Sequence, residues 1–109
     1  PLYDVVTAQV ALNARQIERK QMKMAMSVGT NRHYRFDQIH GRHFVQTAVR
    51  AGLSKKRATG IVEEIVARVP DALDTAASSL PAAFPSATVE AVGAAVMVRV
   101  RGLRLPDTA

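Results

Sequence analysis

The sequence of 109 residues contains no cysteine and no tryptophan, and only five of its residues are aromatic. The absence of cysteine excludes disulfide bonds and cysteine-ligated zinc sites. Apolar residues make up 48% of the chain, which permits a hydrophobic core, but Ala and Val contribute heavily to that share. Small side chains bury little area each, so such a core stabilises weakly per residue. We therefore expect the domain to pack against another surface.

Long apolar runs and the common catalytic motifs are missing as well. No run approaches the roughly 18–20 apolar residues that cross a bilayer, and no signal-peptide pattern is present. The expected location is therefore the bacterial cytoplasm. The sequence has no Walker loop, no G-x-G-x-x-G, no nucleophile elbow and no usefully placed pair of carboxylates. Taken alone, it contains no complete catalytic set.

The net charge of +6 is unevenly distributed along a chain whose length suits a single domain, residues 1–109. Residues 1–57 hold 11 Lys/Arg against 3 Asp/Glu, a net charge of +8, whereas residues 58–109 hold 4 against 6, a net charge of −2. The front half is either a solvated basic surface or a contact site for an anionic partner such as nucleic acid, nucleotide or an acidic protein face. The candidate contact residues are Arg32, Arg35, Arg42, Arg50, Lys55, Lys56 and Arg57.

A β-hairpin is predicted near the middle of the front half. Residues 21–28 and 33–39 alternate in polarity, with period 2, around a turn that contains Gly29. Methionines at helical or strand spacing usually fill irregular gaps in a core. The side chains assigned to the inner face are Met22, Met24, Met26, Tyr34 and Phe36.

The rest of the chain is predicted to be helical. Residues 42–51 form one helix that Gly52 can end, and Ser54 is a good N-cap for a second helix. The apolar residues of that second helix at helical spacing are Ala58, Ile61, Ile65 and Val69. Pro70 either starts a new helical segment or continues the same helix with a kink.

After a linker at residues 81–85, Ser86 is predicted to cap a last helix over residues 87–103, with a strand as the alternative for residues 96–100. Its apolar stripe consists of Val89, Val92, Val96, Val100 and Leu103. These patterns together predict a mainly helical domain with one short hairpin.

Two further sequence motifs are weak indications of a binding site. His40 and His43 are three residues apart, which is a weak metal-binding signal, and capping or solvent-facing roles are the simpler interpretation. Residues 42–69 have the layout of a helix-turn-helix with a basic start to the second helix, which is compatible with DNA binding.

The order of four sequence stretches along the chain is more informative about function than any one of the stretches alone. "PLYDVVTA", "KMAMSVG", "RHFVQTAVRAGL" and "VPDALDTAASSLPAAFPSATVEAV" follow one another along nearly the whole chain. In this order they resemble the C-terminal part of HipA-type serine/threonine protein kinases, the toxins of bacterial toxin–antitoxin pairs. The resemblance implies the helical part of a kinase large lobe.

The resemblance also implies a metal site. In that family the aspartate of a P-x-Y-D stretch binds the Mg²⁺ that bridges the phosphates of ATP. The matching residue is Asp4, with Tyr3 beside it in the nucleotide site. The family's catalytic aspartate, metal-binding asparagine, phosphate loop and lysine precede this stretch and are not in the chain. We therefore expect a fragment that is inactive alone.

The family's partners are implied in the same way. A HipA-type kinase transfers the γ-phosphate of ATP to a protein serine, with glutamyl-tRNA synthetase as the family's type of target. It pairs with a small HipB-like helix-turn-helix antitoxin that binds operator DNA, and the basic front half of this chain would lie near that DNA. The alternatives are a stand-alone basic helical module that binds a protein partner, or a DNA-binding domain.

Overall fold

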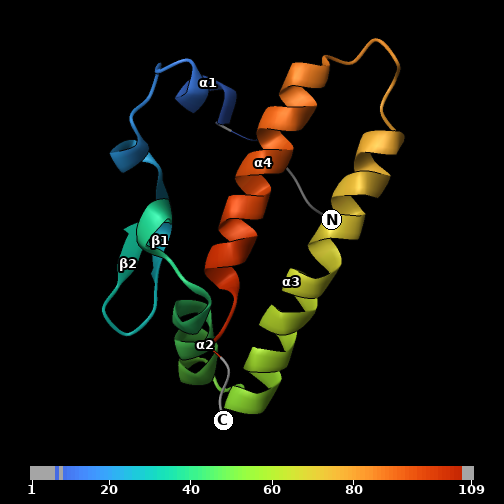
Figure 1. The fold of residues 1–109 in the computed structure, drawn as a ribbon. Helices are drawn as coiled ribbons and strands as arrows, with labels where there is room; N and C mark the ends of the chain where they lie inside the picture. The colour runs from blue at the N-terminus through green and yellow to red at the C-terminus, as the bar shows by residue number, and fades with distance from the viewer. Residues whose placement is uncertain (1–6, 8, 107–109) are drawn as a thin grey trace.

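The computed structural model describes residue 7 and residues 9–106. The described part is mainly helical, with one antiparallel hairpin, as the sequence predicts. Its elements are α1 (Gln9–Asn13), β1 (Lys23–Val28), β2 (His33–Arg35), α2 (Gly41–Arg50), α3 (Lys55–Ser78) and α4 (Ser86–Leu103), with short 3₁₀ turns at Arg19–Gln21 and Phe36–Gln38. The long helices α3 and α4 lie side by side, the hairpin and α1 lie on the other side of α4, and α2 lies near one end (Figure 1).

The hairpin is shorter and less regular than its alternation predicts. Lys23 lies opposite Arg35 and Val28 opposite His33, and the register shifts between these pairs. Such an irregularity changes which side chains face the core. Val28 is buried, whereas Met26 is 78% exposed. The prediction of a buried stripe of three methionines is therefore wrong at Met26.

The second strand also ends earlier than predicted. It stops at Arg35, and residues 36–38 turn as a 3₁₀ helix, so Phe36 is not a strand residue. Tyr34 is half exposed at 44% and is not a core residue. The inner face that the sequence assigned to the hairpin is thus only partly correct.

The end of α2 has the hydrogen bonds of a Schellman motif. The Leu53 N–H donates to the Ala48 carbonyl and the Gly52 N–H to the Val49 carbonyl, each over 3.0 Å. Gly52 has a φ of +111°, a backbone conformation that residues with a Cβ rarely adopt. This confirms that Gly52 ends the helix.

The start of α3 is capped as predicted, because the Arg57 N–H donates to Ser54 Oγ over 3.1 Å. The helix then continues through Pro70 to Ser78, so Pro70 does not start a separate helix. Its buried side agrees with the prediction at Ala58 but not at Ile61 and Ile65. Ala58 and Val62 are buried, whereas Ile61 and Ile65 are 44% and 49% exposed.

Helix α4 confirms the helical prediction for residues 96–100, and Val100 is buried at 4% exposure. Ser86 is its first helical residue instead of its cap. The N-cap position belongs to Pro85, which makes no side-chain hydrogen bond there. Proline pre-sets the backbone angle φ of a turn, so it can precede the helix without acting as a polar cap.

The core is small and lies where α2, α3 and the end of α4 meet. Val45, Ala58 and Val62 form its buried centre. Phe44, Ala48, Val66, Leu103 and Leu105 surround that centre and are only partly buried. A Cβ on Gly41 would collide with the Leu103 carbonyl, so a glycine is what lets α2 begin against the end of α4.

The molecule buries less surface than a chain of this size usually does. Its accessible surface is 8563 Å², whereas a folded monomer of its mass is expected to expose about 5,900 Å². The Cα radius of gyration is 15.6 Å, against about 13 Å for a compact domain of this length. None of the described helices is both long and apolar enough to cross a membrane.

Candidate functional site

Tyr3 and Asp4, the predicted nucleotide and Mg²⁺ contacts, lie outside the described residues. Their roles therefore stay predictions. Within residue 7 and residues 9–106, no group of three or more His, Cys, Asp or Glu side chains is arranged to hold a metal ion. His40 and His43 do not form a metal site of that kind.

Two of the predicted basic residues line one hollow beside the hairpin turn. The turn is fixed on α2 because the Gly29 N–H donates to Thr47 Oγ1 over 2.8 Å and the Thr30 N–H to Gln46 Oε1 over 2.9 Å. Arg32 and Arg50 line the resulting hollow of about 540 Å³. We call it the turn hollow. Its described lining has no carboxylate, so its chemistry suits an anion such as a carboxylate or phosphate.

A second hollow lies between α2, α3 and the segment after α4. Arg42 and Lys55 line it together with Glu63, so its charge is partly balanced. Lys56 and Arg57 are exposed on the first turn of α3, and no ion pair to another described residue involves either of them. Cations at a helix N-terminus oppose the helix dipole, which makes this turn an unfavourable place for them on stability grounds.

Arg35 differs from the other six basic residues. Its Nη2 lies 2.6 Å from Asp37 Oδ2, and both side chains are largely buried, at 36% and 24% exposure. The Arg35 Nε and Asp37 Oδ1 atoms are buried without a hydrogen-bond partner in the described part of the chain. The charge of Arg35 is therefore neutralised by Asp37 in the 3₁₀ turn that follows β2, and it adds little to the basic surface.

The three histidines meet where the hairpin joins α2. The rings of His33 and His43 stack with centroids 3.9 Å apart, and His43 Nδ1 accepts a hydrogen bond from the His40 N–H over 3.0 Å. His43 is 3% exposed. Burial lowers the pKa of His43 below its ordinary value of 6.5, and nearby His33, Arg42 and His40 lower it further. The predicted capping role is thus correct for the His43 side chain.

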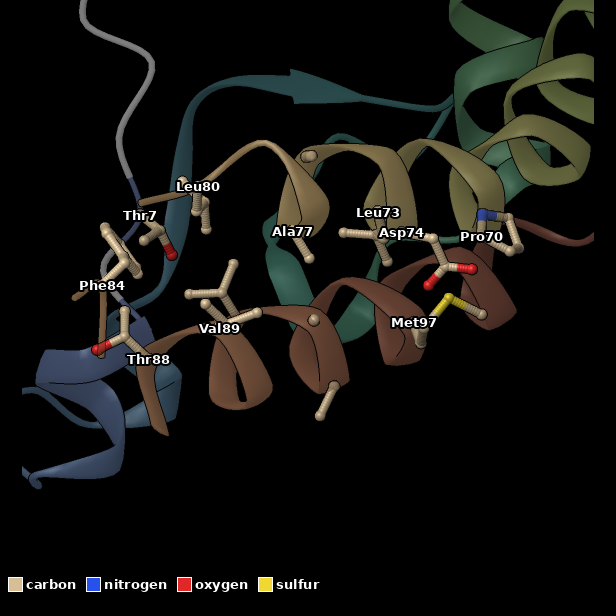
Figure 2. A pocket seen from close by; sticks show the side chains of 14 residues that line it. Thr7, Pro70, Leu73, Asp74, Ala77, Leu80, Phe84, Thr88, Val89 and Met97 are labelled. Atoms are coloured by element: carbon tan, nitrogen blue, oxygen red, sulfur yellow. The ribbon is translucent and has the colours of Figure 1, made fainter. Parts of the chain in front are cut away.

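An apolar groove runs between the second half of α3 and the first half of α4 (Figure 2). It has a volume of about 590 Å³, and Asp74 is the only ionisable side chain among its described lining residues. We call it the helix groove. The residues that line it are Thr7, Pro70, Leu73, Asp74, Ala76, Ala77, Leu80, Phe84, Thr88, Val89, Val92, Gly93, Ala94 and Met97.

No protein-family model matches this chain. Sequence reasoning identified the basic residues of the turn hollow but missed the helix groove and the role of His33. A signal for the groove was present, because Leu73, Ala77 and Leu80 recur at helical spacing after Pro70. The residues that face them on α4 belong to a separate part of the chain, so the sequence does not show that the two sets line one groove.

Proposed function

We propose that this chain is the C-terminal helical part of the large lobe of a HipA-type serine/threonine protein kinase. The order of its motifs along the sequence supports this assignment, as does a mainly helical fold with one short hairpin. A full-length kinase of this type transfers the γ-phosphate of ATP to a protein serine, and glutamyl-tRNA synthetase is the substrate that the resemblance suggests. The cellular location that goes with this proposal is the bacterial cytoplasm.

The observation that carries the proposal is the incomplete burial of the chain's own surface. The chain exposes roughly 2,700 Å² more than a folded monomer of its mass is expected to expose. That excess is as large as a permanent protein–protein interface. Large apolar side chains contribute to it, among them Ile65, Phe84 and Val98. A subdomain that packs against the rest of a kinase lobe accounts for this exposure.

Within such a kinase, the role assigned to Asp4 is to hold Mg²⁺ between the ATP phosphates, with Tyr3 beside it. The metal would neutralise charge on the phosphates during transfer. Phosphoryl transfer depends on positioned groups and electrostatics. This chain has no counterpart of the catalytic base, the asparagine or the nucleotide-binding lysine. The 109 residues alone are therefore expected to be inactive, and autophosphorylation of the purified chain would contradict that expectation.

The first test is the coding sequence upstream of Pro1. The proposal requires an open frame that encodes an Asp-x-x-x-x-Asn motif about 20 codons before Asp4, as expected if one short hairpin intervenes. In the full-length product, Asp4→Asn should abolish transfer of labelled phosphate from ATP. Asp71→Asn, which changes an exposed acid on α3, is the matched control and should leave transfer intact. A frame without the motif, or equal activity of the two variants, would refute the kinase assignment.

The partner in this proposal is a HipB-like antitoxin and, through it, operator DNA. The exposed side chains of Lys55, Lys56 and Arg57 supply the positive charge that would lie near the DNA. Replacing all three by Gln should weaken binding of the kinase–antitoxin complex to its operator and reduce the salt dependence of that binding. If binding is unchanged, this surface does not face DNA.

A second candidate, direct DNA binding, is favoured by one observation. Helices α2 and α3 pack together across the turn at residues 51–54, and the exposed basic residues lie on the first turn of the second helix. In helix-turn-helix proteins, that turn contacts base edges. The isolated chain would then bind duplex DNA with an affinity that falls steeply with salt. Absence of duplex binding at low salt would eliminate this candidate.

A further inference from the structure

The turn hollow contains two arginines that come from different elements. Arg32 lies in the hairpin turn and Arg50 in the last turn of α2, and both line the hollow. No ion pair to another described residue involves either arginine, and the described lining has no carboxylate. The hollow therefore presents two full positive charges to a ligand.

The backbone of Arg32 indicates that an arginine does not stand there for stability. Arg32 has a φ of +55°, a left-handed conformation that is costly for a residue with a Cβ and easy for glycine. Its N–H donates to the Gly29 carbonyl over 3.2 Å, but any residue except proline could make that bond. Strained positions of this kind cluster at ligand sites, where the side chain compensates for the strain by its function.

The hydrogen bonds that hold the hairpin turn on α2 use acceptor atoms of the lining and leave donors for a ligand. Thr47 Oγ1 accepts the Gly29 N–H, and Gln46 Oε1 accepts the Thr30 N–H. A hydroxyl that accepts a hydrogen bond can still donate its own proton, and the amide nitrogen of Gln46 carries two donors. The hydroxyl of Ser27 also lies in the lining, so the hollow suits a ligand group that is rich in acceptors.

The charge of the hollow distinguishes between anions. A carboxylate or a phosphodiester carries one negative charge, whereas a phosphate monoester carries about −1.5 to −2 at pH 7 and offers three acceptor oxygens. Two guanidinium groups match the monoester best, since each can bind phosphate oxygens in a bidentate manner. The C-terminal end of α2 opposes any anion with only about half a negative charge, which the two arginines exceed.

The size of the hollow indicates that the phosphate group has an organic part attached. A volume of about 540 Å³ falls within the range of about 300–1,000 Å³ that is usual for small-molecule sites, and it is larger than a phosphate ion needs. Val49 gives the lining an apolar side chain beside the basic ones.

From these observations we infer that the turn hollow binds a small phosphate monoester, with Arg32 and Arg50 holding the phosphate group and Val49 contacting the organic part. The site contains neither Asp4 nor the basic first turn of α3, so it is independent of the kinase assignment and of the proposed contact with operator DNA.

Titration of the 109-residue chain with phenyl phosphate, followed by the NMR signals of its backbone amides at physiological salt, tests the inference. We expect saturable shifts confined to residues 27–32 and 46–50. Benzoate and dimethyl phosphate should bind about tenfold more weakly, because each carries a single charge and loses charge-assisted hydrogen bonds. Inorganic phosphate should shift the same signals with a several-fold lower affinity, because it has no organic part.

Three variants locate the binding energy. Arg50→Gln should weaken binding of phenyl phosphate about tenfold. Arg101→Gln is the matched control, because Arg101 is also exposed in the last turn of a helix, α4, but does not line the hollow. Arg32→Gly should weaken binding by a similar factor without lowering the urea midpoint of unfolding, because glycine relieves the left-handed backbone.

Localised binding that Arg50→Gln and Arg32→Gly weaken and Arg101→Gln leaves unchanged supports the inference. Shifts spread over basic residues outside the hollow overturn it, as does equal affinity for benzoate. Equal affinity for inorganic phosphate shows that no organic part is recognised, and tighter binding of DNA or RNA at the same residues assigns the hollow to a nucleic-acid backbone; either result overturns the monoester. If Arg32→Gly loses both binding and stability, Arg32 supports the turn and its assigned role is wrong.

Discussion

At the scale of single residues, His43 couples stability to pH. Its folded-state pKa is lowered by burial and by its positively charged or ionisable neighbours His33, Arg42 and His40. Between that lowered pKa and 6.5, the unfolded chain binds more protons than the folded chain, so the free energy of unfolding rises with pH. The stabilisation from neutral His43 is therefore complete above about pH 6.5 and is lost as the pH falls below it.

We expect His43→Asn to reduce this pH dependence. The Asn Oδ1 atom can accept the His40 N–H in place of His43 Nδ1, and it does not titrate. Urea unfolding between pH 7.5 and 5.5 measures the effect, with a limit of about 1.4 kcal/mol per pH unit for one proton. Identical slopes in the variant and the parent chain would show that His43 is not the group responsible.

At the scale of elements, replacing glycine by alanine is expected to change stability in opposite directions at two positions. A Cβ at Gly52 or at Gly60 would meet no other atom within 4 Å, so backbone conformation alone decides the outcome. Gly52 has φ +111° at the end of α2, and Gly52→Ala should cost about 1–2 kcal/mol. Gly60 lies inside α3, and Gly60→Ala should stabilise by about 0.5–1 kcal/mol. Urea midpoints that move in the same direction for both variants would contradict this account.

Local signals explain which elements could be predicted from sequence. The Gly52 end of α2 and the Ser54 cap of α3 depend on backbone groups within five residues, so both were predicted correctly. Continuation of α3 through Pro70 is different, because packing against α4 offsets the lost backbone hydrogen bond. The exposure of Ile61 likewise follows from where α2 and α4 lie around α3, which spacing alone does not encode.

The candidate sites also combine features that the sequence shows with features that depend on how distant segments pack. Basic residues such as Arg32 and Arg50 are visible in the composition, but the hollow that they share exists only because the hairpin turn is hydrogen-bonded to α2. The ion pair between Arg35 and Asp37 was within reach of sequence reasoning, since the two residues are two apart. The helix groove needs two helices from different parts of the chain and was not predictable from either one.

At the scale of the whole molecule, the small buried area predicts that the free energy of unfolding depends only weakly on denaturant concentration. The denaturant m-value scales with the surface exposed on unfolding. With 8563 Å² exposed in the folded state, the isolated chain should have an m-value about three quarters of that of a compact domain of equal length. Urea titration followed by circular dichroism measures it. A full-sized m-value would mean that the chain in solution buries more surface than the structure does.

The central position of α4 has a consequence for how the protein is made. Helices α1, α2 and α3 all contact α4 (Figure 1), yet a ribosome synthesises α4 after every one of them. Until Ser86 and the residues that follow it have emerged, at a rate of about 5–20 residues per second, α2 and α3 can pack only against each other, and the apolar side chains that contact α4 stay uncovered. A message truncated before α4 would therefore produce a polypeptide that engages chaperones and proteases, because its earlier helices would remain without their common packing partner.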